Sequence, residues 1–145
     1  MVFLYNNFGF KVDKNRAGGN GHTTLYLQDK KGNWYAYDQG AIGNHSPIKL
    51  LANMGVGARV SLRRISSPSK DAVMYNTTVS DDKLIYRSAI ESQKSHNSGK
   101  ILYRLFSNNC TDAAVDVINN SGVGINIPNS AFTVKPNSWF EQFWR

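Results

Sequence analysis

The stretch SNNCTDAAVDVI, residues 107–118, decides the fold that we expect for this chain. Its polar beginning is typical of a helix cap, and the apolar residues that follow recur at the spacing of one helix face. We therefore predict a helix that has Cys110 in its first turn and buries its apolar side. A thiol in the first helical turn lies at the positive end of the helix dipole, which favours the thiolate. Cys110 is thus a candidate nucleophile, although a single cysteine is more commonly a small core residue.

A second informative stretch, GHTTLYL at residues 21–27, lies far upstream of this helix and follows a glycine-rich loop at residues 17–21. It predicts a strand over residues 22–28 that begins with His22. A thiol nucleophile needs a nearby base, and an imidazole at the end of a strand can supply it. His22 is therefore the candidate base for Cys110.

Residues 29–32 predict a tight turn that joins this strand to another over residues 33–38. In the resulting hairpin Asp29 pairs with Asn33, so that Thr24 lies opposite Asp38 and His22 is a diagonal neighbour of Asp38 on the same face. Asp38 is the candidate that orients the imidazole. A slip of one residue in the pairing would exchange it for Tyr37 or Gln39.

The rest of the chain reads as short strands and helices. Further strands are expected at residues 3–5, 8–12, 58–65 and 73–79, and an extended segment at 101–106. Helices are expected at residues 47–54, at 80–94 with Ser80 as cap, and at 138–141. Together with 145 residues and 41% hydrophobic composition, this pattern predicts one catalytic domain of α+β class over residues 1–145.

The charge balance predicts anionic partners. Seventeen Lys and Arg against ten Asp and Glu leave a net charge of +7, which suits a nucleic acid, a membrane surface or a bacterial cell wall. The densest basic group has no interleaved aromatic residues of the kind that stack bases, which favours a solvated face, and we expect no stable nucleic-acid complex. That group comprises Arg59, Arg63, Arg64 and Lys70. No run approaches the roughly 18 apolar residues of a membrane span, and residues 1–10 do not resemble a signal peptide.

If the hairpin packs on the cysteine helix, a thiolate–imidazolium pair forms that can attack a carbonyl carbon. Backbone N–H groups at the helix start, including that of Cys110, would then stabilise the oxyanion. The candidate substrate-binding residues are Tyr26, Asn109 and Gly21. No cofactor is expected. The side chains of His22, His45, His96 and Cys110 lack the local spacing of a metal site, so we expect no metal.

The segments GHTTLYL (21–27), GNWYAYD (32–38) and NNCTDAAVDV (108–117) resemble the permuted papain-like fold. This superfamily includes the NlpC-type cell-wall peptidases and the lecithin:retinol acyltransferase-like proteins. The order of histidine before cysteine is similar to its circularly permuted branch, found also in toxin domains of Rhs-type proteins and other secretion effectors. The resemblance implies a central antiparallel sheet packed against the cysteine helix, with Cys110 as nucleophile, His22 as base and Asp38 as third polar residue. It spans about residues 17–140, but these families often carry a residue other than aspartate at the third position.

These observations predict a cysteine hydrolase that cleaves an amide bond, with a peptidoglycan peptide as first choice. The resemblance implies an antibacterial effector that is secreted without a signal peptide, acts in the periplasm or cytoplasm of a target cell, and has a cognate immunity protein. One alternative is an acyltransferase or deamidase that uses the same residues. Another is a basic ribonuclease in which His22 acts with His45 or His96 and Cys110 is not needed. A third is a binding module in which Cys110 belongs to the core.

Overall fold

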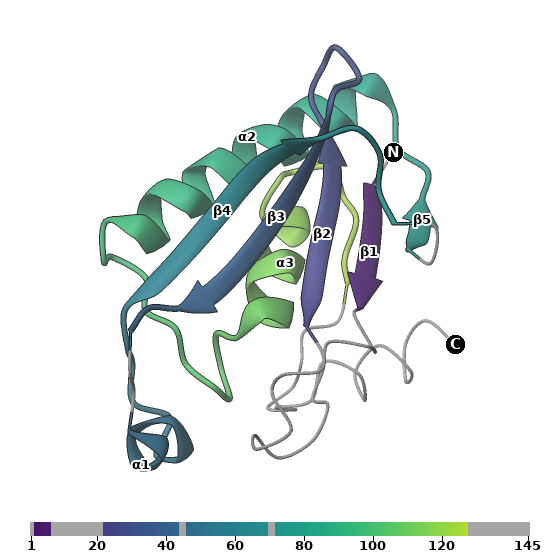
Figure 1. The fold of residues 1–145 in the computed structure, drawn as a ribbon. Coiled ribbons are helices and arrows are strands. Elements are labelled where there is room, and N and C mark those ends of the chain that lie inside the picture. Colours follow the sequence, from purple (N-terminus) through teal and green to yellow (C-terminus); the bar gives the residue numbers. More distant parts are fainter. Residues whose placement is uncertain (1, 7–21, 44–45, 70–71, 128–145) are drawn as a thin grey trace.

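The computed structural model describes residues 2–6, 22–43, 46–69 and 72–127, which form an α+β fold (Figure 1). The strands of the described residues are β1 (Val2–Asn6), β2 (Thr23–Gln28), β3 (Trp34–Ala41), β4 (Ala58–Ile65) and β5 (Val73–Tyr75). The helices are α1 (Pro47–Leu51), α2 (Val79–Asn97) and α3 (Cys110–Asn119). The strands make one sheet in the order β4-β3-β2-β1-β5, and every pair of neighbours is antiparallel.

The hairpin β2–β3 has the predicted register. Leu25 lies opposite Tyr37, and the backbone N–H of Asp29 donates to the carbonyl of Asn33 at 3.1 Å. The turn between the strands places Gly32 at a φ of 79°, a left-handed conformation that costs glycine little because it lacks a Cβ. The predicted pairing is confirmed, and it puts Thr24 opposite Asp38.

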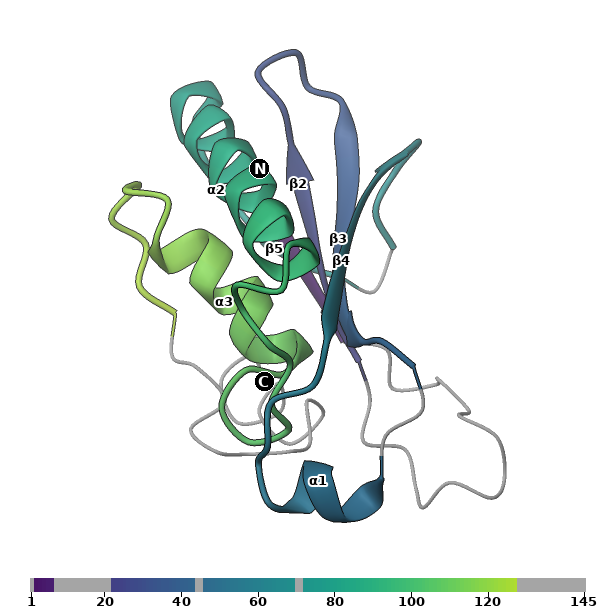
Figure 2. The same cartoon turned by 90° about the vertical axis from the view of Figure 1, so that its left-hand side faces the viewer.

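Helices α2 and α3 cover the same face of the sheet (Figure 2). The core lies between these two layers and is built from alternate residues of the strands and from one side of each helix. Its fully buried members include Leu25, Leu27, Tyr37, Val60, Ile85, Ala89, Val115 and Ile118. Burial of each large aliphatic side chain stabilises the fold by about 1.5–3 kcal/mol, and so holds α3 against β2 and β3.

Helix α3 begins at Cys110 because of its cap, so this residue lies in the first turn as predicted. The Asn109 side chain accepts from the N–H groups of Thr111 and Asp112, while the Asp112 carboxylate accepts from the N–H of Asn109. Such reciprocal bonds satisfy donors that have no partner within the helix. Residues 110–115 of α3 are all buried, so the backbone that carries Cys110 is held in a fixed position.

Other boundaries differ from the prediction. The strand expected over residues 73–79 ends at Tyr75, because Thr78 caps α2 through a capping box with Asp81 and the helix starts before Ser80. The C-terminal end of α2 lies beyond the expected residue 94, at Asn97.

Helix α1 ends at Leu51 rather than at residue 54, and Asn53 then adopts a left-handed φ of 52°. Strand β3 continues past Asp38 to Ala41. The segment 101–106, which is expected to be extended, forms single bridges at Tyr103 and Arg104. The expected strand at 8–12, the glycine-rich loop at 17–21 and the helix at 138–141 lie outside the described residues. Within the described part of the chain, no helix is both long and apolar enough to cross a membrane.

Candidate active site

Three elements bring His22, Asp38 and Cys110 to one end of the sheet. His22 directly precedes β2, Asp38 lies in the second half of β3, and Cys110 is the first residue of α3. Figure 1 shows the beginning of β2, the end of β3 and the first turn of α3 at the same end. The antiparallel hairpin explains the first two positions, and the packing of α3 on β2 and β3 explains the third.

His22 and Asp38 are joined by a hydrogen bond of 3.0 Å between Nε2 and Oδ1. The same carboxylate oxygen accepts from the Thr24 hydroxyl at 2.6 Å. Burial by itself raises the pKa of Asp38, but the hydrogen bonds from His22 and Thr24 outweigh burial and leave the pKa below its ordinary 3.8. Asp38 is thus an anion held against the imidazole, in the geometry that the hairpin register predicts.

The His22 side chain also interacts with Cys110. Burial lowers the pKa of His22, whereas the hydrogen bonds to Asp38 and Cys110 and the charges of both partners raise it, from 6.5 to about 10. The imidazole, 34% exposed, therefore interacts with both the carboxylate of Asp38 and the thiol of Cys110, a residue that is 8% exposed. A histidine with this pKa is protonated at neutral pH and can stabilise a neighbouring thiolate.

A buried hydrogen bond fixes the backbone on both sides of this contact. The hydroxyls of Thr23 and Thr111 lie 2.8 Å apart, and both side chains are almost fully buried. Each threonine follows one of the two reactive residues in the sequence. The bond therefore ties the start of β2 to the start of α3, where their separation decides whether His22 reaches Cys110.

The first turn of α3 offers one backbone donor to a ligand. Asn109 Oδ1 accepts from the N–H of Thr111 at 3.0 Å and of Asp112 at 3.2 Å, so these groups are engaged. Among the described residues, no hydrogen-bond acceptor is found for the N–H of Cys110. This group is suited to hold an anionic oxygen beside the sulfur.

Two of the three predicted substrate-binding residues, Asn109 and Tyr26, lie in the described part of the chain. Asn109 is 3% exposed, and its amide is occupied by the helix cap and by the carbonyl of Leu105, so it has a structural role here. Tyr26 is half-buried on β2, four residues and about 13 Å along the strand from His22. Gly21 lies outside the described residues.

The two alternatives to Asp38 face the helices. The Tyr37 hydroxyl lies 2.7 Å from the Ser92 hydroxyl on α2. The Gln39 amide donates to the carbonyl of Asn108 at 3.0 Å. Asp38, between them, is on the side of the strand that meets the imidazole, as the alternation of side chains requires.

A buried polar cluster behind the site was not foreseen from the sequence. His96 Nδ1 lies 2.8 Å from the carbonyl of Ser92, and its Nε2 lies 3.4 Å from the amide nitrogens of both Gln39 and Asn108. Gln39 Oε1 has no hydrogen-bond partner among the described residues. The cluster links α2, β3 and the loop that precedes Cys110. The alternation of β3 already indicated that Gln39 is buried, and a buried amide needs partners.

His96 is 3% exposed and its ring contacts this cluster rather than His22, so no observation favours the ribonuclease pairing of these two histidines. His45 lies outside the described residues. In the part of the chain that the structure describes, no three His, Cys, Asp or Glu side chains are grouped so that they could hold a metal ion.

Comparisons with models of known protein families, with curated proteins and with solved structures find no match to this chain. The function must therefore be inferred from the site itself. What the site offers is a cysteine at a helix start, a histidine that contacts it, and a carboxylate that holds the histidine. This arrangement can carry out nucleophilic attack on a carbonyl carbon.

Proposed function

We propose that this chain is a cysteine hydrolase with Cys110 as nucleophile, His22 as base and Asp38 as the residue that orients His22. The observation that carries the proposal is the position of the His22 imidazole, which is hydrogen-bonded to Asp38 and also interacts with Cys110. A nucleophile, its base and a third group that orients the base define the catalytic triad by geometry and role, whatever the order in the chain.

The reaction follows from the positions of these groups. In the resting pair the proton of the Cys110 thiol resides on His22, and the thiolate attacks the carbonyl carbon of an amide. The N–H of Cys110 stabilises the oxyanion, and the imidazolium returns the proton to the leaving amine as the carbon–nitrogen bond breaks. His22 then takes a proton from a water molecule, which attacks the thioester and releases the acid and the thiol. Asp38 remains ionised and stabilises the imidazolium throughout.

We further propose that the fold is the circularly permuted papain-like arrangement. Two observations support this proposal: the histidine strand precedes the cysteine helix in the chain, and α3 packs on the strands β2 and β3. The net charge of +7 suits an anionic cell-wall substrate, so a peptidoglycan peptide bond is the first choice. In that role the protein would be a secreted antibacterial effector with a cognate immunity protein.

The reactivity of Cys110 towards iodoacetamide tests the triad without knowledge of the substrate. At mildly acidic pH, we expect fast alkylation of the wild type. The alkylation rate of His22→Ala should be lower by a factor of about 100 or more, because a positioned base contributes about 10²–10⁴-fold to the rate. Lys49→Ala, an exposed change on α1, is the control and should react like the wild type. Equal rates in His22→Ala and the wild type would contradict the triad.

The substrate is tested with purified peptidoglycan. We expect new amino groups and peptide fragments with the wild type and none with Cys110→Ala. Release of ammonia without fragments would instead indicate deamidation, and attachment of an acyl group to an added amine would indicate transfer. RNA cleavage by Cys110→Ala at the wild-type rate would contradict catalysis by the cysteine.

A further inference from the structure

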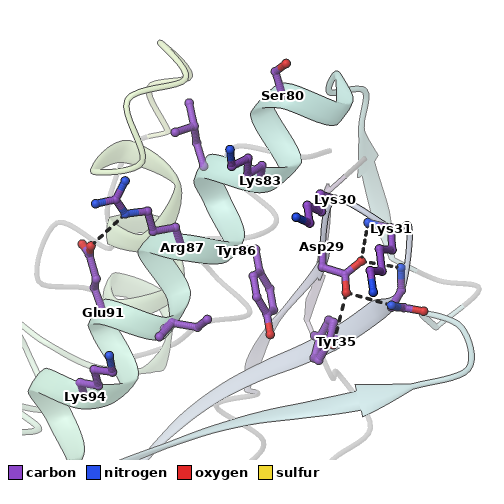
Figure 3. A pocket seen from close by; sticks show the side chains of 13 residues that line it. Asp29, Lys30, Lys31, Tyr35, Ser80, Lys83, Tyr86, Arg87, Glu91 and Lys94 are labelled. Atoms are coloured by element: carbon purple, nitrogen blue, oxygen red, sulfur yellow. Dashed lines mark hydrogen bonds and ion pairs between the residues drawn. The ribbon is translucent and has the colours of Figure 1, made fainter.

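A cavity of about 880 Å³ lies between the β2–β3 turn and helix α2 (Figure 3). Ligand pockets of proteins commonly have volumes of about 300–1,000 Å³. The turn is at the far end of β2 from His22, and six strand residues separate the two by about 20 Å. The cavity is therefore distinct from the candidate active site.

The walls of the cavity carry an excess of positive charge. Lys30 and Lys31 come from the turn, and Lys83 and Lys94 come from α2. Among the described residues, none of these four ammonium groups forms an ion pair. Figure 3 shows Lys30 extending from the turn in the direction of the helix. Cations on both walls attract an anionic group into the space between them.

The two acidic residues of the cavity are already engaged. Asp29 accepts from the backbone N–H of Lys31 and from both the backbone and the amide of Asn33. Glu91 pairs with Arg87 at 3.4 Å. In Figure 3 both lie with their own partners, and so the lysines retain their charge for a ligand.

The cavity also has an aromatic and apolar surface. The rings of Tyr35 and Tyr86 lie 4.9 Å apart between centroids, with their planes tilted by 50°. Figure 3 shows Tyr86 projecting from α2 towards Tyr35 on β3. Leu84, 38% exposed, and Ile90 add apolar surface beside them. A bare phosphate would need only the lysines, whereas aromatic faces bind a planar ring by stacking.

We propose that this cavity binds a nucleotide, with its phosphates between the lysines of the turn and of α2 and its ring against the tyrosine pair. The ligands that fit this site share a planar ring joined to phosphate groups with two or more negative charges. The volume of this open cavity fits a single nucleotide rather than a continuous strand, because one aromatic pair and one end of the hairpin form the site.

Calorimetric titration at low salt, without divalent cations, tests the proposal with ATP, tripolyphosphate and adenosine. We expect ATP to bind at least about tenfold more tightly than either part alone. Tyr86→Ala should weaken ATP binding about 5- to 150-fold, the range found when a stacking side chain is removed, and leave tripolyphosphate binding unchanged. Lys83→Ala should weaken both. Lys49→Ala, which removes an equal charge on α1, should weaken neither.

Tripolyphosphate binding as tight as that of ATP would overturn the proposal, as would ATP binding that neither Tyr86→Ala nor Lys83→Ala affects. If a single-stranded oligonucleotide binds more than about tenfold more tightly than ATP, the ligand of this site is a nucleic acid and the proposal of a free nucleotide is overturned. If Tyr86→Ala fails to fold, Tyr86→Leu retains apolar packing without the ring. The alkylation rate of Cys110 should be unchanged in all these variants, which separates this site from the proposed hydrolase.

Discussion

The two ends of the β2–β3 hairpin use charged side chains in opposite ways. At the open end His22 and Asp38 are only 34% and 27% exposed and bond directly to each other. Beside the turn end, Arg87 and Glu91 of the neighbouring helix α2 form an ion pair and are 76% and 66% exposed. Electrostatic interactions are stronger where water is excluded. One hairpin thus supports short-range chemistry at one end and long-range attraction of an anion at the other.

The largest effect expected from this difference is on the chemistry of the buried end. Asp38→Asn removes a hydrogen bond to a charged group, which contributes about 1.5–3 kcal/mol, so hydrolysis should slow by about 10- to 150-fold. Initial rates on purified peptidoglycan, the proposed substrate, measure this, with Asp29→Asn in the turn as the matched control. A rate for Asp38→Asn equal to that of the control would show that the carboxylate does not orient His22.

A second effect is the pH dependence of stability. The pKa of His22 is raised from 6.5 to about 10, so its contribution is complete below pH 6.5 and is lost as the pH rises towards 10. The pKa of Asp38 is lowered, so its contribution is present above pH 3.8 and is lost as the pH falls.

Urea denaturation of the wild type and His22→Gln across this range measures the effect. We expect the wild type to lose stability relative to the variant between pH 6.5 and 10. If the free energies of unfolding of the two proteins change with pH in parallel, the His22–Asp38 ion pair is contradicted.

The Thr23–Thr111 bond should show a smaller and strongly non-additive effect. Thr23→Val or Thr111→Val alone leaves a buried hydroxyl without its partner, which costs about 1–3 kcal/mol of unfolding free energy. The double variant replaces both hydroxyls by groups of the same shape and should be more stable than the sum of the single effects indicates. Additive losses in the double-mutant cycle would mean that the two hydroxyls do not act as a pair.

The smallest effect is expected at the exposed end. The Arg87–Glu91 pair links residues i and i+4 on the surface of α2. Pairs of this kind contribute about 0.3–0.5 kcal/mol. A double-mutant cycle of Arg87→Ala and Glu91→Ala, followed by thermal unfolding, should give a coupling of this size that disappears in high salt. A coupling above about 1 kcal/mol would remove the contrast between the two ends.

The hairpin and the start of α3 could be predicted because their signals are local. The turn at residues 29–32 sets the register of the hairpin. Asn109 caps α3 through the N–H groups of Thr111 and Asp112, which lie within three residues of it in the sequence. The register alone places His22 beside Asp38. The contact of His22 with Cys110 could be predicted only on the condition that the hairpin packs on the cysteine helix, because no local pattern joins residues so far apart.

Features that depend on distant contacts were harder to predict. Both Thr78 and Ser80 can cap α2, and only the reciprocal bond with Asp81 decides between them. Strand β1 lies between β2 and β5, a pairing for which neither strand carries a local signal. The buried contacts of His96 with Gln39 and Asn108 join three separate elements, so their sequence positions alone did not reveal them.

The two contacts of the His22 ring close chain loops of very different length, 16 residues to Asp38 and 88 to Cys110. The longer loop costs about 1.5 kcal/mol more in chain entropy. A hairpin forms in about 1–10 μs, whereas a ribosome needs about 4–14 s to add the residues between Asp38 and Cys110. A nascent chain can therefore assemble the imidazole–carboxylate half early, while its thiol has not yet been synthesised. We expect chains cut short before α3 to lack thiol reactivity, so that reactivity arises only once α3 has been synthesised.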